Sequence, residues 1–388
     1  VQNLPDPASS RFPLVVASLS NAPIASGQIT DIQSHVDRIQ ATRLETIQSA
    51  KRTLHFETFF MTPGQRADRF ADALGDRARA GVAVQCLVDS YGSRTLPSSY
   101  WNRLRSAGVD VRWFNRFNWK APASYGGRTH RKLLVVDGLL GFAGGMNISA
   151  GNCLESRPRH PIRDMHFTVE GPVVSELQTV FAEDWRFACR ESLTGDLWFP
   201  TPYAPGTTLS RVIPDGPDEN YDTLRQIIVG ALSVAREHVR IMTPYFLPDL
   251  TVQDALKTAA LRGADVDVLL PLRNNLRLVD WASRGQLESL LQWGVRVWFS
   301  PGEFDHSKVF TVDGHWCMVG SANWDPRSLR LNFECNLECY DARLTRLLEG
   351  MLDRGRANAE ELTLARLQAE WLPVRLRNGM ARLLSPYL

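Results

Sequence analysis

The amino-acid sequence contains an internal repeat, in which four blocks occur in the same order in both halves of the 388-residue chain. The first block pairs 53-TLHFETFFMTP with 239-VRIMTPYFLPD. Each copy reads as a strand that follows a helix and ends at a proline-marked loop. A repeat of this length indicates that the chain folds as two similar units.

The second and third blocks each match at one constant offset and are centred on a glycine. Gly81 corresponds to Gly263 in the second block, and Gly108 corresponds to Gly294 in the third. An amphipathic helix precedes each glycine and a β-rich strand follows it, so each glycine is predicted to end a helix. Helices and strands that alternate in this way predict α/β layers around a mostly parallel or mixed sheet.

Length and composition limit the classes of protein that this chain can represent. At this length two domains are expected, and the proline- and glycine-rich stretch 195–208 places the boundary between domains 1–200 and 201–388. A formal net charge of +2 argues against a dedicated nucleic-acid binder, which usually has a pronounced basic excess. No apolar run reaches eighteen residues, so no transmembrane helix is expected. The chain begins at Val1, which leaves open a signal or anchor segment upstream.

The six cysteines form no CxxC pair, so a structural zinc site is not expected. Cys335 and Cys339 lie four residues apart in an apparently alternating strand. We therefore expect both to pack as small apolar side chains.

The fourth block contains the candidate chemistry and pairs 130-HRKLLVVDGLLGFAGGMN with 306-HSKVFTVDGHWCMVGSAN. Histidine is followed by lysine after two residues, by aspartate after seven and by asparagine after seventeen in both copies. The candidate residues are His130, Lys132, Asp137, Gly145 and Asn147 in the first copy, and His306, Lys308, Asp313, Ser321 and Asn323 in the second.

These residue types suit phosphate chemistry. Positions i and i+2 of a strand point to the same face, so each histidine is expected to project beside its lysine. An imidazole is a competent nucleophile and proton carrier near neutral pH, and an ammonium group neutralises phosphate oxygens. One imidazole can attack phosphorus while the other protonates the leaving oxygen, if a pseudo-twofold axis brings both to one site. A single HxK has little weight, but two of them in a chain with five lysines argue against chance.

The repeated pattern resembles the signature of the phospholipase D superfamily. The resemblance implies two similar α/β/α sandwich domains related by a pseudo-twofold, with the active site at their interface. It implies a covalent phosphohistidine intermediate and no metal or other cofactor. By resemblance, His130 is the nucleophile and His306 the general acid. The remaining roles implied are phosphate binding for Lys132, Lys308, Asn147, Asn323, Gly145 and Ser321, and structural support for Asp137 and Asp313.

A further acidic residue follows each motif, in 162-IRDMHFTV and 332-NFECNLE, and alignment of these strands sets Asp164 over Glu334. A carboxylate that accepts from imidazole Nδ1 selects the tautomer and stabilises the cation, as an acid does in the family. The alternative is a solvated carboxylate or a salt bridge with Arg163. Gly145 departs from the serine that the family often has at this point, and we expect this to change the hydrogen bonding of one phosphate oxygen.

Flanking segments favour one branch of the superfamily. The segments 86-CLVDSYGS, 243-TPYFLPD, 279-VDWASRGQLESLLQWGV and 324-WDPRSLRLNFE resemble bacterial cardiolipin synthases, and with the motifs the resemblance covers about residues 40–345. It implies a phosphatidyltransferase that joins two phosphatidylglycerols, or uses a related phospholipid donor, and releases the headgroup. It also implies a location at the bacterial cell membrane, either peripheral or through an N-terminal anchor. A phospholipase D hydrolase that releases phosphatidate and a nuclease with a basic, base-stacking groove remain alternatives.

Two stretches are candidates for a membrane contact. The loop 112–128 interleaves Trp113, Phe114, Phe117 and Trp119 with basic residues. The tail 371–388 places Leu376, Met380, Leu383 and Leu384 on one helical face. Both patterns fit packing within the protein equally well, except that Trp113 is expected to belong to the core.

Overall fold

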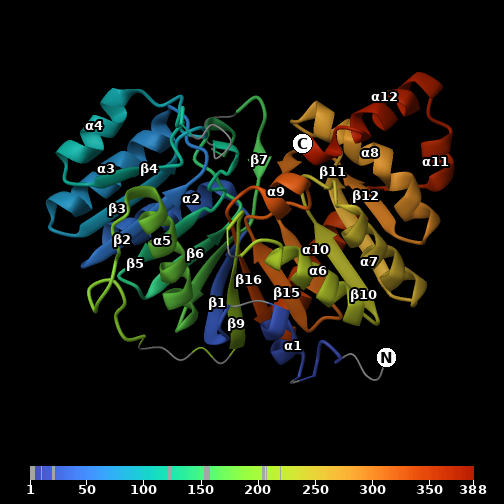
Figure 1. The fold of residues 1–388 in the computed structure, drawn as a ribbon, viewed down its shortest axis with the longest axis horizontal. Coiled ribbons are helices and arrows are strands. Elements are labelled where there is room, and N and C mark those ends of the chain that lie inside the picture. Colours follow the sequence, from blue (N-terminus) through green and yellow to red (C-terminus); the bar gives the residue numbers. More distant parts are fainter. Residues whose placement is uncertain are drawn as a thin grey trace.

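In the computed structural model, one mixed sheet of fifteen strands runs through both halves of the chain, with helices on both of its faces (Figure 1). The structure describes residues 5–9, 11–19, 22–120, 125–152, 158–202, 206, 208–218 and 220–388.

Apart from the short strands β7 and β13 and the short helix α9, the two halves have the same order of elements. The first half comprises β1 (Ala25–Gln33), α2 (Val36–Ser49), β2 (Thr53–Thr58), α3 (Gln65–Arg79), β3 (Ala83–Asp89), α4 (Ser98–Ser106), β4 (Asp110–Phe114), β5 (Leu133–Val136), β6 (Leu140–Gly144), β7 (Ile162–Arg163), β8 (His166–Glu170) and α5 (Val173–Cys189). The second half comprises β9 (Thr208–Asp215), α6 (Thr223–Val234), β10 (His238–Met242), α7 (Leu250–Leu261), β11 (Asp265–Pro271), α8 (Arg277–Gln292), β12 (Arg296–Ser300), β13 (Phe304–Asp305), β14 (Val309–Val312), β15 (Trp316–Gly320), α9 (Pro326–Arg330), β16 (Glu334–Tyr340) and α10 (Ala342–Ala357).

The strand order repeats as well. It runs β4-β3-β2-β5-β6-β8-β1 in the first half and β12-β11-β10-β14-β15-β16-β9 in the second. In each half the first three of these strands are parallel and the others are antiparallel. This order confirms the predicted pair of similar α/β units and the mixed sheet.

Alternating side chains on each strand build the layers. In β5, Leu134 and Val136 pack toward the helices α2, α3 and α4, whereas Leu133 and Val135 pack toward α5. Because successive side chains point to opposite faces, an entirely apolar strand is covered on both sides. Gly81 has a φ of +87°, the left-handed conformation that a helix stop requires and that side chains other than glycine disfavour.

The halves join through strands β1 and β9, which pair antiparallel with Ala25 opposite Ser210. The helix α1 (Phe12–Leu19) lies against α6 of the second half, where the Phe12 ring is 6.3 Å from that of Trp316. The division into domains 1–200 and 201–388 stays a prediction, and residues 203–205 and 207 of the expected linker lie outside the described residues.

The packing of individual side chains tests the predictions for the cysteines and the aromatic residues. Cys335 and Cys339 are buried in the core, as expected. Trp113 is half-buried against the apolar core between the sheet and helices α2, α3 and α4. Phe114 is fully buried, and Phe117 and Trp119 are exposed. No described helix combines the length and the apolar character that a crossing of the bilayer would need.

The chain ends in β17 (Glu360–Leu362), α11 (Leu364–Gln368), α12 (Leu372–Arg382) and the short helix η4 (Ser385–Tyr387). α12 lies along α8 and buries Asn378 and Ala381 there. The apolar face predicted for this tail, which includes Leu376 and Met380, points to solvent.

Candidate active site

The backbone of each HxK segment is hydrogen-bonded to the other half of the chain, next to the acidic residue Glu334 or Asp164. The His130 N–H donates to the carbonyl of Phe333 and the His306 N–H donates to the carbonyl of Arg163, both at 2.8 Å. The short strands β7 and β13, which pair at Arg163 and Asp305, lie between the halves. The contacts are alike in both directions, as a pseudo-twofold relation requires.

The histidines lie in extended segments that immediately precede β5 and β14, and not within the sheet strands as the sequence predicted. The reason is that their backbones pair with the other half and have left the sheet. The expected geometry of i and i+2 is nevertheless present, since Lys308 Nζ is 3.1 Å from His306 Nδ1.

The two imidazoles are held by crossed carboxylates. His130 Nδ1 is 2.9 and 3.0 Å from the two oxygens of Glu334, and His306 Nδ1 is 2.9 Å from Asp164 Oδ2. Each acid therefore serves the histidine of the other half, which the sequence did not reveal. Since Nδ1 is engaged in both rings, Nε2 is the nitrogen that can react with phosphorus.

The electrostatics of the cluster are dominated by burial. Burial lowers the pKa of His130 to about 4 against the pull of Glu334, and burial together with Lys308 and Lys132 lowers the pKa of His306 well below its ordinary value. Burial likewise lowers the pKa of Lys132 to about 7 and that of Lys308 to about 8. Both imidazoles are therefore neutral in the free site at pH 7, the state in which an imidazole is nucleophilic.

The carboxyl groups of Asp164 and Glu334 have different pKa values. Burial raises the pKa of Asp164 to about 7. Burial opposes ionisation of Glu334 too, but His130, Lys132 and the Ser321 hydroxyl outweigh it and lower the pKa of this carboxyl to about 2. Glu334 is thus a permanent anion beside His130, whereas Asp164 titrates near neutral pH.

Gly145 and Ser321 face these carboxylates. Ser321 Oγ donates to Glu334 Oε2 at 2.5 Å, and a Cβ at position 145 would come within 2.8 Å of Asp164 Oδ1. The structure thus places the glycine–serine difference beside the acidic partners, and the expected effect on a phosphate oxygen stays a prediction. A serine at 145 would need Asp164 to move.

The two asparagines keep hydrogen-bonding capacity. The Oδ1 atoms of Asn147 and Asn323 are buried and have no hydrogen-bond partner among the described residues. Asn323 Nδ2 donates to Ser328 Oγ at 3.2 Å, and Gln40 donates to the Asn147 carbonyl at 3.1 Å. Ser328 thus positions the Asn323 amide, Gln40 holds the backbone at Asn147, and both Oδ1 atoms can still contact a ligand.

Asp137 and Asp313 have the same structural surroundings in both halves. Asp137 accepts from the backbone N–H groups of residues 51–53, the closest at 2.7 Å, and Asp313 accepts from those of residues 236–238 at 2.8–2.9 Å. Each carboxylate therefore anchors the turn that precedes β2 or β10, at the far end of the strand that follows the HxK segment.

Sequence reasoning missed the aromatic side chains that border the imidazoles. The Phe59 ring lies 5.1 Å from that of His130, and the Tyr245 ring lies 6.2 Å from that of His306. Both aromatic residues follow the strand of the first repeated block, so their place at corresponding ends of β2 and β10 was the available signal. Among the described residues, no group of three or more His, Cys, Asp or Glu side chains is arranged to hold a metal ion.

Comparison with known proteins places this site in a family. A family model described as "Cardiolipin synthase, PLD-like domain" matches residues 44–185 and 228–355. The chain is 33% identical over 361 residues to a cardiolipin synthase of Oceanobacillus iheyensis, covering 92% of this chain and 74% of that protein. It is 38% identical over 346 residues to cardiolipin synthase A of Pseudomonas fluorescens, covering 89% and 72%.

Solved structures show the same fold. The phosphatidylserine synthase of Haemophilus influenzae superposes with a TM-score of 0.75 at 16% identity, over 98% of this chain and all of that one. With the family model matching more than half of the chain, the conclusion is that this protein belongs to the cardiolipin synthase family of phospholipase D-like proteins.

Proposed function

We propose that this protein is a phosphatidyltransferase that makes cardiolipin from two phosphatidylglycerols, or from a related phospholipid donor, through a phosphohistidine. The observation that carries the proposal is the pair of imidazoles, each oriented at Nδ1 by a carboxylate from the other half and each beside a buried lysine. The similarity to cardiolipin synthases supplies the substrate class. By the same similarity we expect the protein to act at the bacterial cell membrane, where its phospholipid substrates lie.

The proposed reaction has two steps, transfer of the phosphatidyl group to His130 and its transfer to the acceptor lipid. In the first, His130 Nε2 bonds to phosphorus, the bond from phosphorus to the glycerol headgroup breaks, and His306 gives its Nε2 proton to the leaving oxygen. His306 enters this step protonated, because the bound phosphodiester adds negative charge beside it. In the second, the hydroxyl of another phosphatidylglycerol gives its proton to His306 and bonds to phosphorus, and the bond to His130 breaks.

The assignment of the nucleophile rests on Glu334. A phosphorylated imidazole is a cation, and a permanent carboxylate at Nδ1 stabilises it. Glu334 has both oxygens at His130 Nδ1 and a hydroxyl donor in Ser321. Lys132, Lys308 and the two asparagines are proposed to contact the phosphate oxygens.

Neutralising the crossed acids should slow the reaction. Glu334→Gln and Asp164→Asn preserve size but remove the charge that stabilises each imidazolium, so each is expected to lower kcat at least about a hundredfold. Turnover of phosphatidylglycerol in detergent micelles measures the effect. Glu303→Gln, which changes a half-exposed carboxylate near β13, is the matched control and should stay within about twofold of wild type. Unchanged kcat in both acid variants would contradict the role of the crossed pairs.

Activity should fall on the alkaline side. Burial lowers the pKa of Lys132 to about 7 and of Lys308 to about 8, so both ammonium groups lose their charge as pH rises through these values. Since the phosphate contacts need the cations, kcat/KM for phosphatidylglycerol is expected to decline from about pH 7 to 9. Initial rates across this range, with circular dichroism to show that the protein stays folded, measure it. A kcat/KM that rises steadily to pH 10 would contradict the lysine assignment.

Mass spectrometry of the lipid products tests the function itself. Phosphatidylglycerol is incubated with the wild type and with the His130→Ala variant. Cardiolipin and free glycerol, both absent with the variant, are the expected result. Phosphatidate alone would show a hydrolase on the same scaffold, and cleavage of nucleic acid with no lipid product would show a nuclease.

A further inference from the structure

We propose that α12 and η4 form a membrane-docking surface that holds the protein on a bilayer containing anionic phospholipids, with Phe117 and Trp119 of the segment 115–120 as its second contact. This surface is called the tail stripe below and comprises Trp371, Leu372, Leu376, Met380, Leu383 and Tyr387. It rests on the proposed function only in that a phospholipid substrate lies in a bilayer.

The tail stripe is an ordered helix face that the fold leaves uncovered. Leu372, Leu376, Met380 and Leu383 follow one another at helical spacing and are 58–78% exposed. Isolated exposed apolar residues are common on protein surfaces, whereas a continuous row along one helix marks a contact surface.

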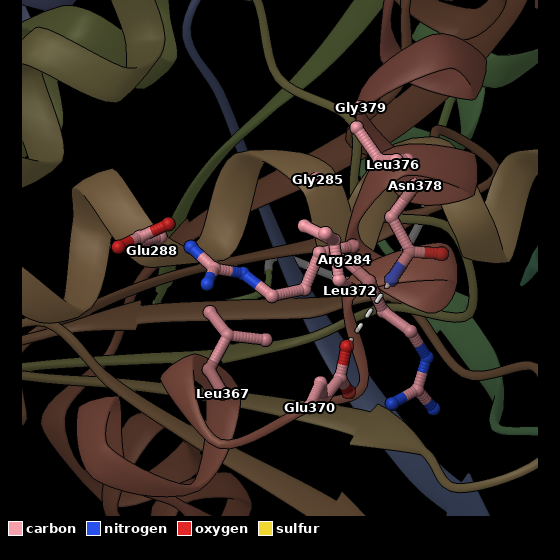
Figure 2. Close-up of a pocket in the computed structure, with 10 residues that line it drawn as sticks. Arg284, Gly285, Glu288, Leu367, Glu370, Leu372, Leu376, Asn378 and Gly379 are labelled. Atoms are coloured by element: carbon pink, nitrogen blue, oxygen red, sulfur yellow. Dashed lines mark hydrogen bonds between the residues drawn. The ribbon is translucent and has the colours of Figure 1, made fainter.

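The opposite side of α12 is fixed to the protein. Asn378 and Ala381 are buried against α8, and Arg377 stacks 4.5 Å above the ring of Trp281. Figure 2 shows Asn378 bonded to Glu370, and Gly285 of α8 beside α12. A Cβ at position 285 would lie 2.6 Å from the Asn378 carbonyl oxygen, so glycine permits this contact. The stripe is therefore presented by a docked helix and not by a loose end.

The positive charge of the tail favours a surface with anionic lipid headgroups as its partner. Residues 371–388 contain no acidic residue, and Arg375 and Arg382 are exposed on α12, whereas Arg377 is held against Trp281. Arginines beside a row of leucines suit a surface with anionic headgroups over acyl chains. Trp371 and Tyr387, at the two ends of the stripe, are of the residue types enriched at the boundary between lipid and water.

The position of the tail stripe near the candidate site also supports a membrane contact. η4 contacts α9, the helix that begins three residues after Asn323. On its other side, Arg327 of α9 donates to the Gly126 carbonyl at 3.3 Å. The neighbouring Tyr125 ring lies 5.2 Å from that of Phe117, which forms an exposed pair with Trp119 at 4.7 Å. Figure 1 shows α12 and β7 along the upper side of the molecule, α9 below them and α1 on the lower side. Two exposed apolar surfaces thus lie next to α9, whose Ser328 accepts from Asn323 of the candidate site.

Vesicle flotation tests the proposal. The 388-residue chain is mixed with vesicles of phosphatidylcholine alone or with phosphatidylglycerol, and the partition coefficient is measured. The wild type should bind the mixed vesicles more tightly. The triple variant Leu376→Ser/Met380→Ser/Leu383→Ser should bind them at least about tenfold more weakly. The matched control Leu14→Ser/Leu261→Ser/Leu347→Ser removes three equally apolar exposed residues on α1, α7 and α10 and should bind as the wild type does.

The outcomes separate this inference from the proposed function. A wild type that floats with mixed vesicles but yields no lipid product would remove the enzymatic proposal and leave the docking surface standing. Failure of the wild type to float, or equal binding by wild type and stripe variant, would overturn the docking surface even if the enzyme is active on micelles. A stripe variant that instead halves the mass measured by sedimentation would assign the stripe to contact between two copies, and would overturn the proposal as well.

Discussion

Replacing either His130 or His306 by alanine is expected to reduce turnover of phosphatidylglycerol at least about a thousandfold, the upper range for loss of a nucleophile or a general acid. The physical reason is that neither role has a substitute nearby. The imidazoles sit in crossed pairs with Glu334 and Asp164, and the ammonium groups of the lysines beside them donate to the backbone carbonyls of the two histidines. Product formation measured by mass spectrometry gives the effect.

A phosphatidyl ester of p-nitrophenol separates the two roles, because this leaving group needs no protonation. With His306→Ala we expect a burst of about one equivalent of nitrophenol and a trapped phosphohistidine, because attack by His130 proceeds while activation of the acceptor does not. With His130→Ala we expect no burst. The reverse pattern would exchange the roles, and near-normal turnover in either variant would refute the mechanism. His315→Ala, in the turn between β14 and β15, is the control and should behave as wild type.

Arg131→Met is expected to destabilise the protein by about 3–5 kcal/mol, the usual cost of leaving buried charge without its partner. Arg131 lies between the candidate site residues His130 and Lys132 but points into the protein, where it is ion-paired with Asp184 and donates to the Glu334 carbonyl at 3.0 Å. Burial raises the pKa of Asp184 and that of nearby Glu57, which shows how little water stabilises these carboxylates. Urea unfolding followed by tryptophan fluorescence measures the loss of stability.

The pH dependence of that loss gives a second check. Without Arg131, protonation of Asp184 in the folded state removes the unpaired buried charge. The loss in free energy of unfolding caused by Arg131→Met should therefore be smaller at pH 5 than at pH 8. Arg163→Met removes a half-exposed arginine whose ion pair with Glu303 spans 3.9 Å, and should cost less than about 1 kcal/mol. Equal stability of Arg131→Met and Arg163→Met would contradict the importance of the buried ion pair.

Much of the architecture was readable from the repeat. Apolar strands, helices that end at glycine and their duplication predicted two similar α/β units with a mixed sheet, because these patterns depend on neighbouring residues along the chain. The candidate site residues could be selected from the sequence too, since HxK places both side chains on one side of a single extended segment. The position of the histidines within a strand was wrong, because the backbone pairing that removes them from the sheet involves the other half of the chain.

The sequence alone determined which residues could do phosphate chemistry and that they occur twice. Only the tertiary structure decided which acid serves which histidine, since the partners of His130 and His306 lie 204 and 142 residues away in the sequence. It likewise decided which face of the tail is covered. Helical periodicity shows that a helix has an apolar face, but whether that face meets protein or solvent depends on what packs beside it, and α8 takes the Asn378 side and leaves the leucines outside.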